Sequence, residues 1–321
     1  MGAMSEQQHR LEEAEALLVQ AGCRVLRPFV GHARAYHTPA EPVRIGRGVF
    51  VDTETTGPDV AVDQIIQLAA IPFDYEATTG QILRVGPALV SYEEPTRAIS
   101  PESAAVHGIT MERLVGQRHD DAAIAREWEA ADLIVAHNSG FDRPLLDRRF
   151  PTLPARAWGC SYVDIPWRRA KYPSSSLGAL LIEHTEHFFA GHDAADDCYA
   201  ALHCLAYPLV LPDAPAVAQY PLSWILKAVE KPAHRVSAVG APFDLKDKLA
   251  RRGYKWNDPS RPGALAGVPK AWYRDVHADD YAAELAWLTS EIYGGRSAQL
   301  CAHLRELPAT QRFARAGAAR A

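Results

Sequence analysis

The spacing of hydrophobic residues changes several times along the chain, and each change predicts a different element of structure. Residues 5–22 place leucines on one side of a helix and glutamates on the other, the pattern of an amphipathic helix. A connection containing proline and histidine follows it. Short apolar runs then predict strands at residues 48–55, 64–74 and 81–95.

After these strands the pattern alternates between helix and strand. The apolar run 133–138 predicts a further strand, and helical spacing recurs at about residues 111–131, 141–149, 175–185 and 193–210. Strands first, followed by alternating strands and helices, predict an α/β or α+β domain with a mixed central sheet. Ser100 and Pro101 predict a helix start, because serine is a favoured cap and proline a favoured first residue.

A proline-rich stretch divides the chain. Residues 208–222 contain four prolines and neither lysine nor arginine, which is typical of a linker between domains. We expect the last residues, 309–321, to be frayed. The predicted parts are an N-terminal helix and connection (1–47), a main domain (48–208), a linker (209–222) and a smaller C-terminal α+β domain (223–321).

Composition narrows the class of protein. Apolar residues make up 48 % of the 321 residues and charged residues 23 %, as in ordinary globular chains. No apolar run approaches the ~18 residues of a membrane span, and no secretory signal begins the chain, so we expect a cytoplasmic protein without a membrane partner. The five scattered cysteines argue against a disulfide framework and a zinc site. At a net charge of −5, any nucleic-acid binding must come from local patches.

Two carboxylates end the first long apolar run. Alternate side chains of a strand share a face, so Asp52 and Glu54 point the same way. Side by side at the end of a buried strand, they repel each other unless they are protonated or bind a cation. On this pattern alone, a metal site and a solvated strand end are equally good interpretations.

Two further acidic segments lie downstream. In the segment from His137 to Asp142, an apolar strand delivers an acid to the next helix, where the helix dipole alone could explain it. Farther on, His192 precedes a helix in which Asp197 shares a small apolar face and should point inward. Asp196 should point outward, and Asp193 is best explained as a helix cap.

In this order and combination, the acid pair, the HNxxFD segment and the His-x4-Asp helix start resemble the DEDDh exonucleases. That superfamily includes the proofreading epsilon subunit of bacterial replicases. The resemblance covers about residues 48–207, and the segment 100–110 (SPESAAVHGIT) resembles the family's HGIT turn and the loop before it. It implies an α/β fold with an RNase H-like mixed central sheet flanked by helices.

The resemblance also implies a role for each residue. Two divalent ions would be held by Asp52, Glu54, Asp142 and Asp197, and His192 would be the general base. Oxygen-only ligands favour Mg²⁺ or Mn²⁺, and a pair of such ions suits in-line phosphoryl displacement. The expected activity is 3′→5′ exonucleolytic hydrolysis of DNA that releases nucleoside 5′-monophosphates.

Other residues near these motifs are candidates for substrate binding. The turn after the acid pair lies beside the terminal nucleotide in this family. Phe141 could stack on a base, although a core position is the more common use of an aromatic there. His137 and Asn138 either contact substrate or satisfy the strand end. The full candidate set is Thr55, Thr56, Gly57, His107, His137, Asn138 and Phe141.

The C-terminal part is rich in basic and aromatic residues. Residues 225–275 contain 11 Lys or Arg against 5 Asp or Glu, a composition that suits single-stranded nucleic acid. Tyr254 and Trp256 are our candidates for base stacking. The alternative is a small α+β domain with its aromatics in the core. The segment resembles a module found after some bacterial exonuclease domains.

The expected partner is DNA, as single strands or 3′ ends, with RNA as the alternative substrate and a DNA polymerase or other replisome component as a further partner. A non-catalytic nucleic-acid-binding or replisome-tethering module is the rival from another class. All five catalytic positions are present, which argues against it. The main domain is expected to hydrolyse a short oligonucleotide without residues 223–321.

Overall fold

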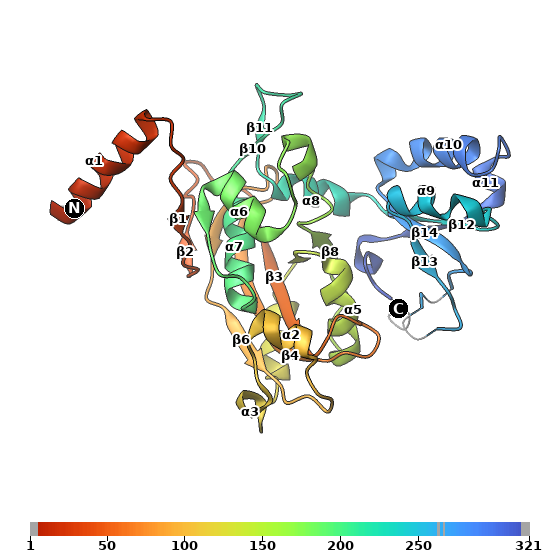
Figure 1. Ribbon diagram of the computed structural model, residues 1–321, viewed down its shortest axis with the longest axis horizontal. Coiled ribbons are helices and arrows are strands. Elements are labelled where there is room, and N and C mark those ends of the chain that lie inside the picture. The colour runs from red at the N-terminus through yellow and green to blue at the C-terminus, as the bar shows by residue number, and fades with distance from the viewer. Residues whose placement is uncertain (1–5, 262–263, 266, 316–321) are drawn as a thin grey trace.

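A seven-stranded mixed sheet forms the centre of the larger part of the molecule (Figure 1). The computed structural model describes residues 6–261, 264–265 and 267–315. The strand order is β2-β5-β4-β3-β7-β8, and β6 pairs with β4. β3 and β4 are antiparallel, whereas β3, β7 and β8 are parallel. The strands are β2 (Arg34–Ala35), β3 (Ile45–Thr55), β4 (Ile65–Glu76), β5 (Ile82–Val85), β6 (Leu89–Tyr92), β7 (Leu133–Ala136) and β8 (Ala157–Cys160).

Helices cover both faces of this sheet, because side chains of β3 alternate between two hydrophobic clusters. Val49 and Val51 pack with α4 and α5, whereas Phe50 packs with α6, α7 and α8. The RNase H-like mixed sheet flanked by helices is therefore confirmed. The helices are α4 (Asp121–Glu129), α5 (Ser139–Arg149), α6 (Leu177–Thr185), α7 (Ala194–Ala206) and α8 (Leu222–Glu230).

Two short helices connect β6 to α4. α2 (Pro101–His107) begins as the sequence predicts, because the Ser100 side chain accepts a hydrogen bond from the backbone N–H of Ser103. It ends at Gly108, which has the left-handed backbone that glycine adopts without strain. α3 (Met111–Leu114) follows directly. This turn brings His107 to the end of β3, where its ring contacts the carbonyl oxygen of Thr55.

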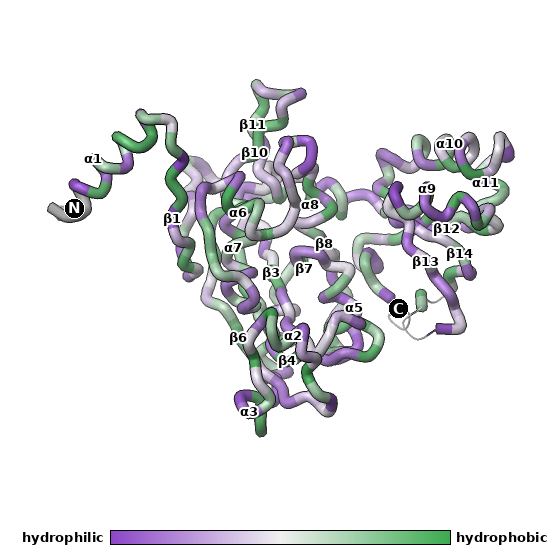
Figure 2. Tube along the Cα trace, viewed as in Figure 1, coloured by the Kyte–Doolittle hydropathy of each residue, from purple (hydrophilic) through white to green (hydrophobic). Residues whose placement is uncertain are grey.

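The N-terminal segment adds to the edge of the larger part. β2 extends the sheet beside β5, and β1 (Arg27–Pro28) pairs with β9 (His187–Phe188). The amphipathic helix α1 (Glu6–Gln20) forms as expected but projects from the molecule, and hydrophobic and hydrophilic stretches alternate along it (Figure 2). No helix within the described ranges has the length and apolar character that crossing a membrane requires.

An antiparallel sheet of four strands organises the smaller part, in the order β13-β14-β12-β15. Helices pack on it around a separate hydrophobic core, so this part is the expected α+β unit. Its elements are β12 (Ala233–Ala238), β13 (Lys255–Asn257), β14 (Ala271–Val276), β15 (His303–Leu307), α9 (Lys246–Arg251), α10 (Tyr281–Glu291) and α11 (Ala298–Cys301).

The segment between the two parts is more structured than a linker. β10 (Leu209–Val210) and β11 (Ala218–Gln219) form a short antiparallel ladder within it. α8 belongs to the larger core, because Ile225 packs closely over Gly159 of β8, where a Cβ would lie 2.1 Å from the isoleucine side chain. We propose that the boundary between the parts lies near Lys231, after α8 and not before it.

The expected fraying of residues 309–321 is wrong for residues 309–315. Phe313 packs against the cluster of α4 and α5, and Arg143 of α5 donates to the carbonyl oxygen of Thr310 at 2.6 Å. Arg312 donates to the carbonyl oxygen of Trp158 in β8. These long-range contacts have no local sequence signal. Residues 316–321 lie outside the described part of the chain.

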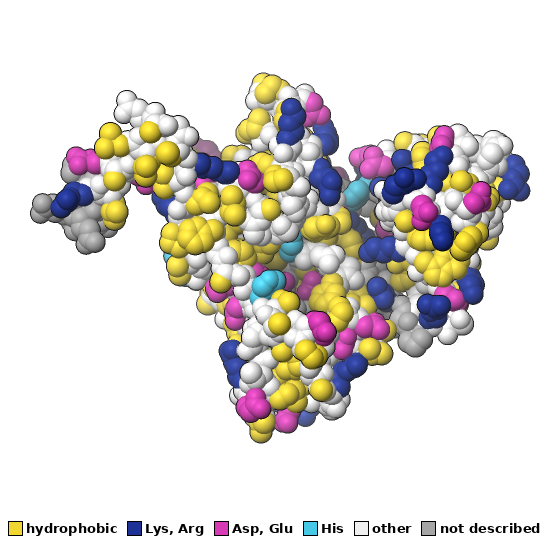
Figure 3. All heavy atoms as spheres, in the orientation of Figure 1, with side chains coloured by type: hydrophobic (Ala, Val, Ile, Leu, Met, Phe, Trp, Pro, Cys, Tyr) yellow, Lys and Arg dark blue, Asp and Glu magenta, His cyan; other side chains and the backbone are white. Residues whose placement is uncertain are grey.

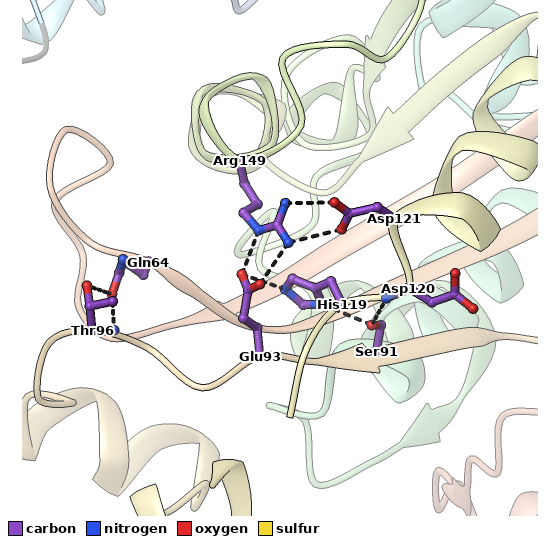
Figure 4. Close-up of polar contacts among 8 residues, drawn as sticks. All are labelled: Gln64, Ser91, Glu93, Thr96, His119, Asp120, Asp121 and Arg149. Carbon is purple, nitrogen blue, oxygen red and sulfur yellow. Dashed lines mark hydrogen bonds and ion pairs between the residues drawn. The ribbon is translucent and has the colours of Figure 1, made fainter. Parts of the chain in front are cut away.

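A polar network holds the C-terminal end of α5 (Figure 4). Arg149 donates to both carboxylate oxygens of Glu93, at 2.6 and 2.7 Å, and to Asp121 at the start of α4. Beside it, the ring of His119 contacts the Ser91 hydroxyl, and burial lowers the pKa of this histidine to about 4. The network fixes the position of α5, whose other end carries Asp142.

Candidate active site

The last turns of β3 carry the predicted acid pair. Asp52 and Glu54 lie on the face that Phe50 shares with α7, as the alternation along the strand requires. The pairing with β4 shifts register between Glu54 and Thr55, so the strand bends where its acidic side chains emerge. The pairing with β4 therefore holds the acid pair in place, just beyond the residues of β3 that pair with β7.

Asp142 reaches the same strand end from α5. The helix starts after Asn138, whose left-handed backbone (φ 79°) turns the chain sharply out of β7. Asp142 lies in the first turn and is buried, and Thr53 donates its hydroxyl to Oδ1 of Asp142 at 2.8 Å. That hydrogen bond fixes the carboxylate against the strand that carries the other two acids.

The start of α7 supplies the remaining members. Asp193 caps the helix by accepting from the N–H groups of Ala195 and Asp196, as predicted. His192 is exposed and holds a left-handed backbone (φ 65°), uncommon for a residue with a side chain, and donates its N–H to Asp197 at 3.1 Å. Asp197 points inward and Asp196 is exposed, in agreement with the helical spacing.

These elements converge on one place. Atoms able to bind a metal from Glu54, His192 and Asp197 all lie within 4.8 Å of one another. Asp52 and Asp142 lie close enough to act on each other and on this group electrostatically. In Figure 3, histidine and acidic side chains meet near the middle of the visible face of the larger part.

The electrostatics reflect burial of like charges. Burial raises the pKa of Asp52 well above its usual range, and repulsion from Asp142, Asp197 and Glu54 adds to this effect. Burial, reinforced by Asp197 and Asp142, raises the pKa of Glu54 to about 8. For Asp142, burial outweighs the Thr53 hydrogen bond and raises the pKa to about 7. For Asp197, burial outweighs the N–H of His192 and raises the pKa to about 6.

This donor set fits hard divalent cations. Within the described ranges, no Lys or Arg forms an ion pair with any of the four carboxylates, and His192 offsets only part of the charge of Asp197. Carboxylate oxygens are the ligands that Mg²⁺ and Mn²⁺ prefer. By its chemistry this group of side chains could hold a divalent metal ion.

The turn after β3 is rigid. Thr55 donates to the carbonyl oxygen of Gly57 at 2.7 Å, and Thr56 donates to Asp63 at 2.9 Å. Gly57 has no room for a side chain, because a Cβ there would lie 2.5 Å from a carboxylate oxygen of Asp63. Both threonine hydroxyls are thus used within the turn. Their contribution to a substrate site would be through the shape of the backbone.

The other substrate candidates divide into two groups. His107 contacts Thr55 beside the site, and burial, with a smaller effect of nearby His192, lowers its pKa. His137 is engaged by Ser161 and Ser175, and burial lowers its pKa to about 4, so it satisfies the strand end. Asn138 is exposed. Phe141 is partly buried against the cluster of α4 and α5, the core position considered for it.

Two supporting residues escape sequence reasoning. Buried Gln67 of β4 donates to Asp193 at 2.8 Å and accepts from the N–H of Ala194, so it attaches the start of α7 to the sheet. Buried Asp63 accepts from Thr56 and pairs with Arg97. A glutamine inside the apolar run QIIQLAA is a usable signal, because a buried amide needs partners. Nothing local marks Asp63.

Comparison with known proteins accounts for this arrangement. The sequence model of a family described as "Exonuclease" (RNase T type) matches residues 49–205. Residues 49–205 are therefore similar to this exonuclease family, and we call them the exonuclease domain. The matched residues include the four carboxylates on β3, α5 and α7, and also the loop before α7, which carries His192.

The exonuclease domain is similar to parts of larger proteins. It is 30 % identical over 154 residues to the PolC-type DNA polymerase III of Thermotoga petrophila. The aligned region covers 46 % of this chain and 11 % of that protein. It is 29 % identical over 154 residues to exodeoxyribonuclease 10 of Escherichia coli K12, covering 47 % of this chain and 63 % of the relative. The chain therefore spans less than two thirds of these relatives.

A solved structure is also similar. Exonuclease X in complex with 5′ overhanging duplex DNA is 26 % identical and covers 49 % of this chain and 89 % of that chain, with a TM-score of 0.35. Each of these three similarities covers less than half of the chain. The four-stranded part lies outside the family match at residues 49–205, so its role has to be inferred from its own residues.

Proposed function

We propose that the protein is a metal-dependent 3′→5′ exonuclease that removes nucleoside 5′-monophosphates from DNA. One observation carries this proposal. Four carboxylates from β3, α5 and α7 crowd together without a basic partner among the described residues, and exposed His192 stands beside them. Such a cluster is unfavourable unless it binds cations, so its retention indicates a ligand.

Each residue has a role in this proposal. Asp52, Glu54, Asp142 and Asp197 would hold two Mg²⁺ or Mn²⁺ ions, which stabilise charge on the attacking and leaving oxygens when bound. Thr53 and the capped start of α7 orient the carboxylates before substrate arrives. His192, exposed at the rim, would take a proton from the attacking water.

The direct test uses labelled nucleic acids. The full chain is incubated with 3′-labelled and 5′-labelled oligonucleotides, single- and double-stranded, as DNA and as RNA, with Mg²⁺ or with EDTA. A 3′-labelled strand should release its label at once as a mononucleotide, whereas a 5′-labelled strand should shorten stepwise. Stepwise shortening of the 3′-labelled strand would reverse the polarity, and cleavage in EDTA would exclude the metal mechanism.

The same experiment addresses the alternatives. Faster trimming of RNA would make the protein an exoribonuclease, because the metal site engages phosphates and contacts to the 2′-hydroxyl decide the sugar. Binding without cleavage under every condition would favour the tethering module. Similarity to PolC-type polymerases makes a replicase the protein partner that we propose to test next, by co-purification with and without DNA.

A further inference from the structure

A cleft of about 330 Å³ lies where the two sheets meet. We call it the inter-sheet cleft. Gly140, Val163 and Asp164 of the exonuclease domain form one wall, and residues of β12, β13 and β14 form the other. The sequence predicts nucleic-acid contacts in residues 223–321, with Tyr254 and Trp256 as the stacking candidates, but it does not predict this cleft.

The lining is strongly basic. Six of the lining residues are Lys or Arg and two are Asp, in a chain whose net charge is −5. Figure 3 shows Lys and Arg side chains gathered along the hollow between the two lobes. The basic residues are Arg235, Arg252, Lys255, Arg274, Arg312 and Arg315.

Part of this charge is structural. Arg235 forms a two-pronged pair with Asp275, at 2.6 and 2.7 Å, and Arg312 pairs with buried Asp164 at 2.5 Å. These pairs are close to neutral and hold the walls together. They account for both acidic residues of the lining.

Among the other basic residues of the lining, positive charges outnumber the carboxylates that pair with them. Arg252 and Arg274 share the single carboxylate of Glu284, at 3.0 and 2.8 Å, which leaves one positive charge between them. Lys255 is exposed and forms no ion pair with any residue that the structure describes. Neither surplus charge has a carboxylate of its own among the described residues, so both are available to an anionic ligand.

The location of the cleft relates it to the active site. Its wall residue Gly140 lies in the same first turn of α5 as Asp142. Tyr273 and Phe313 also line the cleft and offer aromatic surface beside the charges. Surplus cations next to aromatic rings suit single-stranded nucleic acid, through phosphate contacts and stacking.

We propose that the inter-sheet cleft holds the backbone of a single nucleic-acid strand that leads to the active site. The proposal rests on the proposed function and adds a binding site away from the reacting phosphate. The base-stacking candidates inferred from the sequence change accordingly. Tyr254 is 3 % exposed and donates to Glu284, so it cannot stack on a base, whereas Trp256 is 48 % exposed outside the lining of the cleft.

The test separates binding from cleavage. Binding of a fluorescent oligothymidylate to the full chain is followed by anisotropy in EDTA, over a range of salt concentrations. Lys255→Glu should weaken binding roughly five- to tenfold at moderate salt and flatten the salt dependence by about one unit of slope. Lys255→Arg should bind like the wild type. Arg10→Glu, on α1 at the opposite end of the molecule, is the matched control and should also leave binding unchanged.

A dinucleotide assay with Mg²⁺ distinguishes the two proposals. If the cleft holds the strand away from the reacting phosphate, cleavage of a dinucleotide should be equal in the wild type and in Lys255→Glu. Lys255 lies exposed on β13, the outermost strand of its sheet, and thermal melting should show that the variant folds. Unchanged oligothymidylate binding by Lys255→Glu, or an equal loss with Arg10→Glu, would overturn the cleft proposal. Tighter binding of duplex than of single strands would overturn its choice of ligand. Failure of the wild type to cleave the dinucleotide would count against the proposed function alone.

Discussion

Asp142 and Asp164 are both buried aspartates of the exonuclease domain, 2 % and 7 % exposed, yet their surroundings are opposite. Around Asp142, burial dominates and raises its pKa to about 7. Around Asp164, burial also raises the pKa, but hydrogen bonds and charge from His277 and Arg312 outweigh it and hold the pKa below its usual range. One aspartate lacks a basic partner, and the other has two.

This difference in partners separates the proposed metal site around Asp142 from the structural ion pair around Asp164. A buried carboxylate paired with a guanidinium is close to neutral, and breaking such a pair is costly. A buried group of carboxylates without a counter-charge destabilises the protein until a cation arrives. Burial alone therefore does not distinguish the two aspartates, whereas the lack of a Lys or Arg partner among the described residues supports the proposed metal site.

The largest expected effect comes from removing one unpaired acid. Asp52→Asn should lower the cleavage rate by roughly 10³-fold or more, because a carboxylate ligand of the metal is lost. In EDTA the same variant should melt a few degrees higher, because like-charge repulsion is relieved. Cleavage assays and thermal melting measure the two effects. The control is Asp196→Asn, which changes an exposed acid near the site and should keep wild-type activity. If Asp52→Asn folded stably and kept wild-type activity, our account of Asp52 would be refuted.

The second effect concerns His192, which lies close enough to Glu54 and Asp197 to be either a base or a ligand. If it is the base, His192→Ala should reduce turnover by ~10²–10⁴ and leave Mn²⁺ binding intact. Calorimetry measures the binding and single-turnover kinetics the rate. Loss of Mn²⁺ binding in this variant would make the histidine a ligand and enlarge the metal site.

The buried pair of Asp164 and Arg312 should contribute to the stability of the fold. Arg312→Ala should lower the free energy of unfolding by about 3–5 kcal/mol, because Asp164 is left buried without its guanidinium. Denaturant titration measures it. Arg169→Ala removes an exposed pair with Asp213 and should have a much smaller effect, because solvent screens that pair. Equal effects of the two variants would show that the buried pair has no special role.

The smallest effect is on pH dependence. Folding raises the pKa of Glu54 to about 8 and of Asp142 to about 7, above their values in the unfolded chain. The folded protein thus binds more protons, and the stability from these groups is lost as pH rises through these values. Between pH 6.5 and 8, melting in EDTA should fall by a few degrees. The buried histidines, with pKa values of about 4, stay neutral in this range.

Metal should cancel this slope, because ions bind the deprotonated carboxylates. Melting with Mg²⁺ should exceed melting in EDTA by more at pH 8 than at pH 6.5. Glu54→Gln is the matched variant and should flatten the slope in EDTA. A wild-type slope of the opposite sign would mean that the carboxylates are already compensated in the metal-free protein.

Local periodicity predicted the parts of the site that depend on one element. Alternation along β3 placed Asp52 and Glu54 together, and helical spacing chose Asp197 over Asp196 as the inward acid. Neither pattern could show that Asp142 joins them, because α5 meets β3 only in the folded chain. The resemblance to a known family supplied that connection and the role expected of His192.

Long-range partners were beyond sequence reasoning. The sequence left His137 open between a substrate contact and a role at the strand end, because Ser161 and Ser175, which engage it, come from distant segments. Tyr254 looked like a stacking residue in a basic segment, but its hydroxyl reaches Glu284 in a buried cluster. Propensity and spacing describe each element alone. Which polar groups meet depends on how the elements pack.

The return of residues 309–315 to the exonuclease domain has a consequence for synthesis of the protein. Arg312 follows Asp164 by 148 residues, which a ribosome adds in roughly 7–30 s. During that interval Asp164 has no guanidinium partner, so its burial is unfavourable. β8 also lacks its contact with Arg312, which has not yet been synthesised. The last contacts of the exonuclease domain must therefore wait until translation has passed residue 312, and a ribosome stalled before that point would display this domain without them.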